Sequence, residues 1–308
     1  MIDGILPVNK PENISSAQVV ARVKRALKAK KAGHTGTLDP FATGLVLVAL
    51  GKATRISKFF LEGRKSYLAR VALGVETDTH DITGTRTAEA DPSLLSRITN
   101  SQLEEAVMEF QGVQDQVAPS FSALKHQGTP LYKLARQGKM IQKPPRQIEI
   151  FDIQITRMGV PEFEIRVVCS SGTYIRGLAR DLGRKLGCGA HLSGLVRTGS
   201  SQFRLEDAVS LEEMEKANPD DLAQKVIPMS DCLDFMDAIR ADQALAQKIR
   251  YGQKLGRGDI DPSRIEKGQA GDKISEFVRV IDDTGILLAL ISPEKNSSTY
   301  NYSCVFAG

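Results

Sequence analysis

The chain has 308 residues, of which 41% are hydrophobic and 25% charged, and its net charge at pH 7 is +4. This composition indicates a globular protein with a substantial core and room for two domains. The sequence has no apolar run of about 18 residues and no N-terminal export pattern, which excludes a helical membrane protein and favours the cytoplasm.

Cysteine and histidine spacings exclude the common metal and disulfide signatures. The four cysteines contain no C-x-x-C pair, and the four histidines contain no H-E-x-x-H pair. Neither a zinc site nor a disulfide framework is therefore indicated. We expect free thiols that are mostly buried, and no bound metal.

Charge is distributed unevenly along the chain. Residues 1–75 carry thirteen Lys or Arg against four acids, whereas residues 205–237 carry ten acids and two lysines. Clustered basic residues favour binding to an anionic polymer, because each phosphate contact releases counterions. The alternative is an ordinary solvated charged face.

The N-terminal segment predicts a short strand, a proline-containing turn and a helix capped by Ser15 or Ser16. Apolar residues of this helix recur at spacings of three and four, while its basic residues occupy the other faces. Lys10 lies in the turn and is either a support for a substrate loop or an ordinary turn lysine.

Residues 32–44, AGHTGTLDPFATG, predict a glycine-rich loop between that helix and an apolar strand at residues 45–50. Asp39 is the only acid in the loop. One explanation is that Asp39 caps the turn, as Asp before Pro commonly does. The other is that stiff neighbours hold a reactive carboxylate.

Residues 51–63 predict a helix, and residues 65–73 alternate as a strand with one apolar face does. Tyr67 opens this strand and is either a core residue or part of a site. The preceding GLVLVALGK segment is not a P-loop, because its glycines have the wrong spacing. Binding of a nucleoside triphosphate is therefore not supported.

Residues 101–111 predict a helix with Ser101 as its cap and Glu104 at the capping-box position. The segment 118–147 that follows is polar, proline-rich and basic. A segment of this length without regular structure is either a functional insertion or a mobile solvated loop.

Two alternating strands are expected at residues 147–158 and 162–169, followed by a helix that begins near Tyr174. The apolar residues of this helix should face the core, and its basic residues should face away from it: Arg176, Arg180, Arg184 and Lys185. Arg176 stands in the first turn, where the helix dipole prefers acids. It therefore requires an anionic partner, for which Asp39 is the natural candidate.

The last seventy residues predict a β-rich module. Residues 238–255 indicate a short helix, and residues 256–272 are polar and rich in glycine. Three strands are expected after them, at residues 276–282, 285–294 and 300–308.

Four segments together resemble the TruB family of pseudouridine synthases, which isomerise uridine 55 in the T arm of tRNA. They are HTGTLDPFATG at 34–44, SALKHQGTPLYKLARQG at 122–138, SSGTYIR at 170–176 and HLSGLVRTG at 191–199. The first resembles the catalytic motif. The second lies in a segment similar to the insertion with which the tRNA-specific members clasp the T arm.

The resemblance implies a catalytic set of four residues. Asp39 would act at the ribose C1′ as a nucleophile or at C2′ as a base, and the sequence does not separate these. Arg176 would keep Asp39 charged and aimed. Tyr67 would stack on the flipped uracil and help to remove its C5 proton, and Tyr174 would line the pocket. The chemistry needs no cofactor and no metal.

The resemblance also implies a set of substrate-binding residues. Leu195 would close the pocket wall, and His34 would stack near the space that the flipped base leaves. The remaining residues expected to support or contact RNA are Lys10, Arg197, Lys125 and Tyr132.

The implied fold is α+β, with a catalytic domain around a mostly antiparallel mixed sheet and a small C-terminal β-rich domain of the PUA-like, RNA-binding kind. We place the catalytic domain at residues 1–234, with the clasping insertion at about 118–147, and the second domain at residues 235–308. The expected partner is the T-arm stem-loop of tRNA, without a membrane, and a monomer is expected.

Three other functions are compatible with parts of the sequence. A non-catalytic tRNA-binding or folding factor would use the same basic face without Asp39. A guide-dependent pseudouridine synthase subunit would share the motifs, although the insertion argues for stand-alone action. A glycosidase would need a second carboxylate in a comparable loop, and the sequence offers none.

Overall fold

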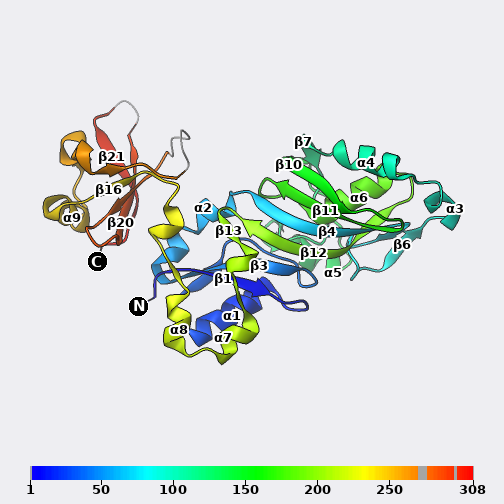
Figure 1. The fold of residues 1–308 in the computed structure, drawn as a ribbon, viewed down its shortest axis with the longest axis horizontal. Helices are drawn as coiled ribbons and strands as arrows, with labels where there is room; N and C mark the ends of the chain where they lie inside the picture. Colours follow the sequence, from blue (N-terminus) through cyan, green and yellow to red (C-terminus); the bar gives the residue numbers. More distant parts are fainter. Residues whose placement is uncertain (1, 270–275, 295–296, 308) are drawn as a thin grey trace.

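The computed structural model describes residues 2–269, 276–294 and 297–307. Within these ranges the chain forms two main sheets of unequal size, which lie at opposite ends of the molecule (Figure 1). Residues 270–272 of the predicted glycine-rich segment and Gly308 of the last predicted strand lie outside the described residues. In the part described, no helix is long and apolar enough to cross a membrane.

The larger sheet has eleven strands among the described residues. Its main path, in spatial order, is β14 (Val209–Ser210), β1 (Gly4–Lys10), β3 (Thr43–Leu50), β12 (Ala190–Ser200), β4 (Lys65–Leu73), β11 (Glu162–Cys169), β10 (Arg146–Arg157) and β7 (Gly112–Gln116). The strands β2 (Ala32–His34), β13 (Phe203–Arg204) and β15 (Ile227–Pro228) pair with β3, β12 and β1.

Most pairings in this sheet are antiparallel, and two are parallel, namely β1 with β14 and β12 with β3. The α+β prediction with a mostly antiparallel mixed sheet is confirmed. The parallel pairing at β3 and β12 joins the two halves of the sheet and places Arg197 opposite Gly44. It therefore brings two of the four sequence motifs side by side.

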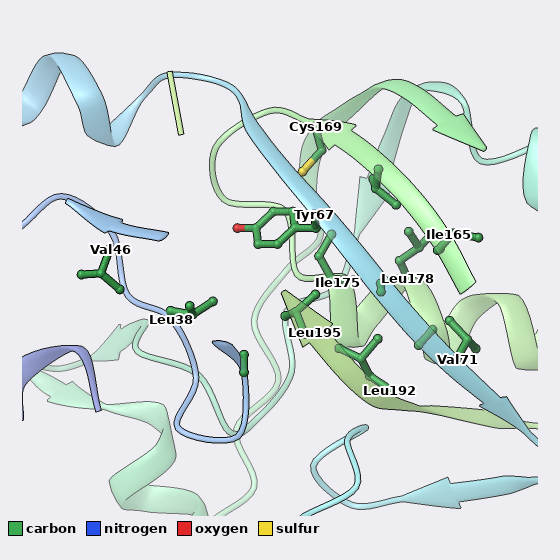
Figure 2. Packing of buried hydrophobic residues seen from close by; sticks show 14 of the residues in the cluster. Leu38, Val46, Tyr67, Val71, Ile165, Cys169, Ile175, Leu178, Leu192 and Leu195 are labelled. Carbon is green, nitrogen blue, oxygen red and sulfur yellow. The ribbon is translucent and has the colours of Figure 1, made fainter. Parts of the chain in front are cut away.

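Alternating side chains explain why these segments are strands. On β4, Tyr67, Ala69, Val71 and Leu73 are buried, and the residues between them are more exposed. The buried face packs against helices and forms the main core, as Figure 2 shows around β4. Burial of this face determines the register of the strand, because a shift by one residue would expose it.

The helices of the described chain are α1 (Ser16–Ala26), α2 (Ser57–Leu61), α3 (Pro92–Leu95), α4 (Asn100–Met108), α5 (Leu131–Arg136), α6 (Ile175–Lys185), α7 (Leu211–Lys216), α8 (Pro219–Gln224) and α9 (Gln243–Arg250). Of these, α6 packs on β12 and β4 and supports the candidate site. Two short hairpins accompany them, β5 (Val75–Thr77) with β6 (Arg86–Glu89) and β8 (Lys125–His126) with β9 (Thr129–Pro130).

The smaller sheet comes from the C-terminal part of the chain. In spatial order its strands are β17 (Leu255–Gly256), β21 (Thr299–Val305), β20 (Leu287–Pro293), β19 (Val278–Ile281), β16 (Ala238–Arg240) and β18 (Ile265–Glu266). The three strands predicted after residue 275 are therefore present. This β-rich part is docked on the larger sheet by a shared apolar cluster that includes Phe60, Met236 and Leu290.

Four local predictions were wrong. Residues 238–255 begin with strand β16 before α9, because Ala238 and Ile239 pair with both β18 and β19. The expected loop at 32–44 begins with strand β2, which pairs with β3. The expected helix at 51–63 is a 3-10 turn (Gly51–Arg55) followed by the short α2.

The fourth wrong prediction concerns the cap of α4. Thr99, not Ser101, is the N-cap, and Gln102, not Glu104, completes the capping box. Both pairs match the Ser/Thr-x-x-Glu/Gln pattern.

Candidate active site

Asp39 lies in the segment between β2 and β3, and its side chain is 33% exposed. Ser16 fixes the preceding residue from the first turn of α1: its Oγ accepts from the Leu38 N–H at 2.8 Å and donates to the Leu38 carbonyl at 3.1 Å. Ser15 is the true cap of α1, which leaves the Ser16 hydroxyl available for this contact. The acid is therefore held on a fixed backbone.

Lys10 holds the other side of Asp39. Its ammonium is buried and donates to the carbonyls of Pro11, Ile14 and Pro40 at 2.8, 2.9 and 3.0 Å. Burial lowers the pKa of Lys10 from 10.5 to about 8, and the nearby Asp39 carboxylate partly opposes that effect. Of the two roles predicted for Lys10, these contacts favour support of the loop.

Arg197 on β12 binds the same loop from behind. Its guanidinium donates to the carbonyls of Gly36, Thr37 and Leu45, at 3.2, 3.2 and 2.7 Å, and the residue is 3% exposed. We expected Arg197 to contact RNA. Its donors instead face protein carbonyls, so the observed contacts are those of a residue that positions the Asp39 loop.

The Asp39 carboxylate forms an ion pair with Arg176 of α6. Nε of Arg176 lies 2.8 Å from Oδ2 of Asp39, and Nη2 donates to Oδ1 at 3.3 Å. The other donors of the guanidinium reach the carbonyls of Thr79 and Phe121, both at 2.9 Å. A planar guanidinium held at several points fixes the direction of its carboxylate partner.

Asp81 is a second carboxylate beside Arg176, at the end of the acid-rich segment TDTHD at residues 77–81. It is 3% exposed, and its Oδ2 lies 3.5 Å from Nη1 of Arg176, while Oδ1 accepts from the hydroxyl of Thr79 and the N–H of Thr83. Its position in the acid-rich segment TDTHD was the only signal in the sequence. Asp39 is the more exposed of the two carboxylates and the one free to meet a substrate.

The prediction that the arginines of α6 face away from the core is wrong for two of them. Arg176 and Arg180 are 5% and 7% exposed, whereas Arg184 is exposed. Arg180 pairs with its neighbour Asp181 at 2.8 Å and reaches the carbonyl of Val117. Both buried arginines face loops that supply acceptors, which is why their burial is tolerated.

Tyr67 and Leu195 form an apolar wall on the adjacent strands β4 and β12, and each is 8% exposed. Figure 2 shows the two side chains close to Ile175, with the Tyr67 hydroxyl directed toward the side on which Leu38 and Val46 lie. Burial raises the pKa of Tyr67. Its phenol is therefore neutral at physiological pH.

Tyr174 stands at the N-cap of α6, two residues before Arg176, and is partly buried. Burial raises the pKa of its hydroxyl as well. The structure thus brings Asp39, Tyr67, Tyr174, Arg176 and Leu195 together on the loops and strand ends around α6.

The three remaining predicted contact residues lie on β2, β8 and α5. His34 is on β2, and burial together with Arg197 lowers its pKa, so its imidazole is neutral. Lys125 is exposed on β8, and Tyr132 lies on α5 with its ring 5.7 Å from the Arg136 guanidinium carbon. Among the described residues, none of the three forms a hydrogen bond or ion pair with Asp39.

The described ranges contain no group of three or more His, Cys, Asp or Glu side chains that could hold a metal ion. The four cysteines are buried and unpaired.

Two family models match the chain in succession. Residues 24–175 match the TruB family pseudouridylate synthase N-terminal domain, and residues 176–234 match the tRNA pseudouridylate synthase B C-terminal domain. The boundary between the two matches falls at the start of α6.

Named relatives match over almost the whole chain. The protein called tRNA pseudouridine synthase B from Geobacter sulfurreducens is 41% identical, over 94% of this chain and 93% of its own. The protein of the same name from Dehalococcoides mccartyi is 38% identical, over 96% of this chain and 94% of its own. Among solved structures, a chain in the crystal structure of a Cbf5-Nop10-Gar1 complex aligns with a TM-score of 0.72 and 25% identity, covering 98% of this chain and 84% of that chain.

Proposed function

Because the chain belongs to the TruB family of pseudouridylate synthases, we propose that it converts uridine 55 in the T arm of tRNA to pseudouridine. The enzyme class follows from the family: the protein is an isomerase that acts on RNA. The relatives' name, tRNA pseudouridine synthase B, supports tRNA as the substrate. The T arm as the target rests on the resemblance of the insertion at 118–147 to a T-arm clasp.

The reaction breaks the N1–C1′ glycosidic bond, turns the uracil and rejoins it through C5. The C5 proton is lost, and N1 gains a proton. The target base is stacked within an RNA loop, so it must first be flipped out, at a cost of a few kcal/mol. The neutral Tyr67 ring, next to Leu195, offers a surface on which the face of an extruded base can stack.

The observation that carries the proposal is the partly exposed Asp39 carboxylate paired with the buried Arg176. The guanidinium fixes the direction of the carboxylate, and part of the carboxylate stays accessible to a sugar. Attack on C1′ and proton abstraction at C2′ both need an ionised carboxylate. We propose that Asp39 supplies the catalytic carboxylate, as nucleophile or base, that Arg176 is its partner, and that Tyr67 and Tyr174 hold the uracil.

The test is mass spectrometry of a tRNA transcript incubated with the purified chain. The wild-type protein should form pseudouridine at position 55, and Asp39→Asn should form none while its affinity for the tRNA persists. Asp91→Asn is a matched control, because Asp91 caps the exposed helix α3 and an amide caps equally well. Turnover by Asp39→Asn would rule out the proposed chemistry.

A bare T-arm stem-loop distinguishes the rival functions. Activity of the purified chain on this RNA supports a stand-alone enzyme, as does the insertion. Activity only with an added guide RNA would indicate a guide-dependent subunit, and binding without product would indicate a folding factor. We further propose a cytoplasmic monomer whose C-terminal residues 235–308 form an RNA-binding domain.

A further inference from the structure

The side-chain amide of Gln116, the last residue of β7, forms two hydrogen bonds with the backbone at the start of α6. Its Oε1 accepts from the Tyr174 N–H at 2.8 Å, and its Nε2 donates to the Tyr174 carbonyl at 3.0 Å. The residue is 5% exposed. The oxygen and the nitrogen of the Gln116 amide thus both bond to the backbone of Tyr174.

This contact holds the N-cap residue itself, whereas an ordinary cap side chain accepts from the N–H of the second or third helical residue. Tyr174 is the N-cap of α6 and makes no capping hydrogen bond through its side chain, since a phenol cannot reach back as Ser, Thr, Asp or Asn does. Gln116 instead holds Tyr174 through an amide on strand β7, 58 residues earlier in the chain. The direction of α6 is thereby tied to the edge of the large sheet.

The side chain of Gln116 packs closely against the first turn of α6. A Cβ added to Gly177, in the first turn of α6, would lie 3.0 Å from Nε2 and 3.1 Å from Cδ of Gln116. Contacts of 3.0 to 3.4 Å are tighter than ordinary packing. Gly177 therefore lets the amide lie directly against the helix, one residue after Arg176.

The segment that follows Gln116 continues along α6. The carbonyl of Val117 accepts from Nη2 of Arg180 at 3.4 Å, and the carbonyl of Phe121 accepts from Nη2 of Arg176 at 2.9 Å. Arg176 is consequently held between Asp39 and residues 116–121. A displacement of this segment relative to α6 would change the direction from which Arg176 reaches Asp39.

We propose that Gln116 is a positioning residue for the isomerisation, because its amide sets the start of α6 and with it the alignment of Arg176 and Tyr174. The proposal rests on the proposed function. Glutamine suits the position because the site needs a donor and an acceptor at the same reach. An ionised Glu lacks the donor, and Met lacks the donor and offers only a weak acceptor.

The experiment measures the single-turnover rate of Gln116→Met and of Gln102→Met on a T-arm RNA. The enzyme is in saturating excess over the RNA, so that this rate is independent of the active fraction of the enzyme. Gln102 is the matched control, since its Oε1 also holds a helix N-terminus by accepting from the Thr99 N–H at 2.9 Å, but in α4. For Gln116→Met, the single-turnover rate should fall by about 10- to 100-fold, because small misplacements cost that much. Its RNA affinity should stay within about threefold of wild type, since no RNA contact is removed. Gln102→Met should keep the wild-type rate even where its melting temperature falls.

The outcomes separate this inference from the proposed function. If wild-type protein forms no pseudouridine, the proposed function fails first. If wild-type protein is active and folded Gln116→Met reacts at the wild-type rate, Gln116 is a purely structural residue and the inference fails. Should Gln116→Met not fold, Gln116→Glu retains the size and the acceptor for Tyr174 N–H, and a wild-type rate for that variant overturns the inference equally.

Discussion

The Arg176 guanidinium meets the Asp39 carboxylate across 137 residues of sequence, with Nε 2.8 Å from Oδ2 and Nη2 3.3 Å from Oδ1. Both groups are held from other sides as well, Arg176 by two carbonyls and the Asp39 loop by Ser16, Lys10 and Arg197. The Asp39–Arg176 ion pair thus joins the Asp39 loop and α6, each of which is also held by other contacts.

Arg176→Lys should lower the single-turnover rate of pseudouridine formation by about 100-fold, the cost of removing one well-placed donor from an active site. Lysine keeps the charge, but its single ammonium cannot replace the planar fork with which Arg176 meets both Asp39 oxygens. Arg184→Lys is the control, since Arg184 is on the same helix but its side chain is 60% exposed and its Nε lies 3.8 Å from Glu76. Equal rates for the two variants would contradict the role of the ion pair.

Arg197→Gln should reduce activity without changing the salt dependence of RNA binding, because the buried Arg197 guanidinium donates to three protein carbonyls. Lys125→Gln, on the exposed insertion, should instead lower the slope of log affinity against log salt by about one. Titrations of T-arm RNA at several salt concentrations measure both slopes. A reduced slope for Arg197→Gln would restore the original expectation that it contacts RNA.

Gly44→Ala should destabilise the fold more than Gly112→Ala does. The two glycines have φ values of +103° and +104°, but a Cβ at Gly44 would lie 2.4 Å from the Arg197 carbonyl oxygen, whereas nothing lies within 4 Å at Gly112. The backbone strain, about 1 to 3 kcal/mol, is common to both variants. The steric overlap adds about 1 to 3 kcal/mol at Gly44 only. Urea denaturation of the two variants measures the difference in their free energies of unfolding. Equal losses of this free energy would show that β3 and β12 can separate at no cost.

His80 should make folding less stable as the pH falls from 6.5 toward 4. Burial, followed by the charges of Arg180 and Arg176, lowers the pKa of His80 from 6.5 to about 4. Between these values the unfolded chain binds more protons than the folded chain, so the free energy of unfolding decreases with falling pH. The expected contribution is up to about 3 kcal/mol.

His80→Asn isolates this contribution, because Asn does not titrate and tolerates the φ of +61° at this position. Urea denaturation across the pH window should show a shallower decline for the variant than for the wild-type protein. Parallel declines would mean that His80 is solvated enough to accept a proton in the folded state.

Much of the candidate site could be predicted from local sequence. The alternation in residues 65–73 predicted strand Lys65–Leu73 and its buried Tyr67, because period-two burial depends on neighbouring residues alone. Arg176 in a first helical turn called for an anionic partner, and the motif around Asp39 supplied one. These features follow from residue type and short spacing.

Only the tertiary structure decided which polar groups hold that arrangement in place. Ser16, Gln116 and Asp81 act on residues that are distant in sequence, and Arg180 is buried because the carbonyl of Val117 lies within reach. Helical periodicity could not predict this burial, since it describes one helix face and not the loops packed against it. A buried charge is stable only where such acceptors converge, and their convergence depends on the strand order of the whole sheet.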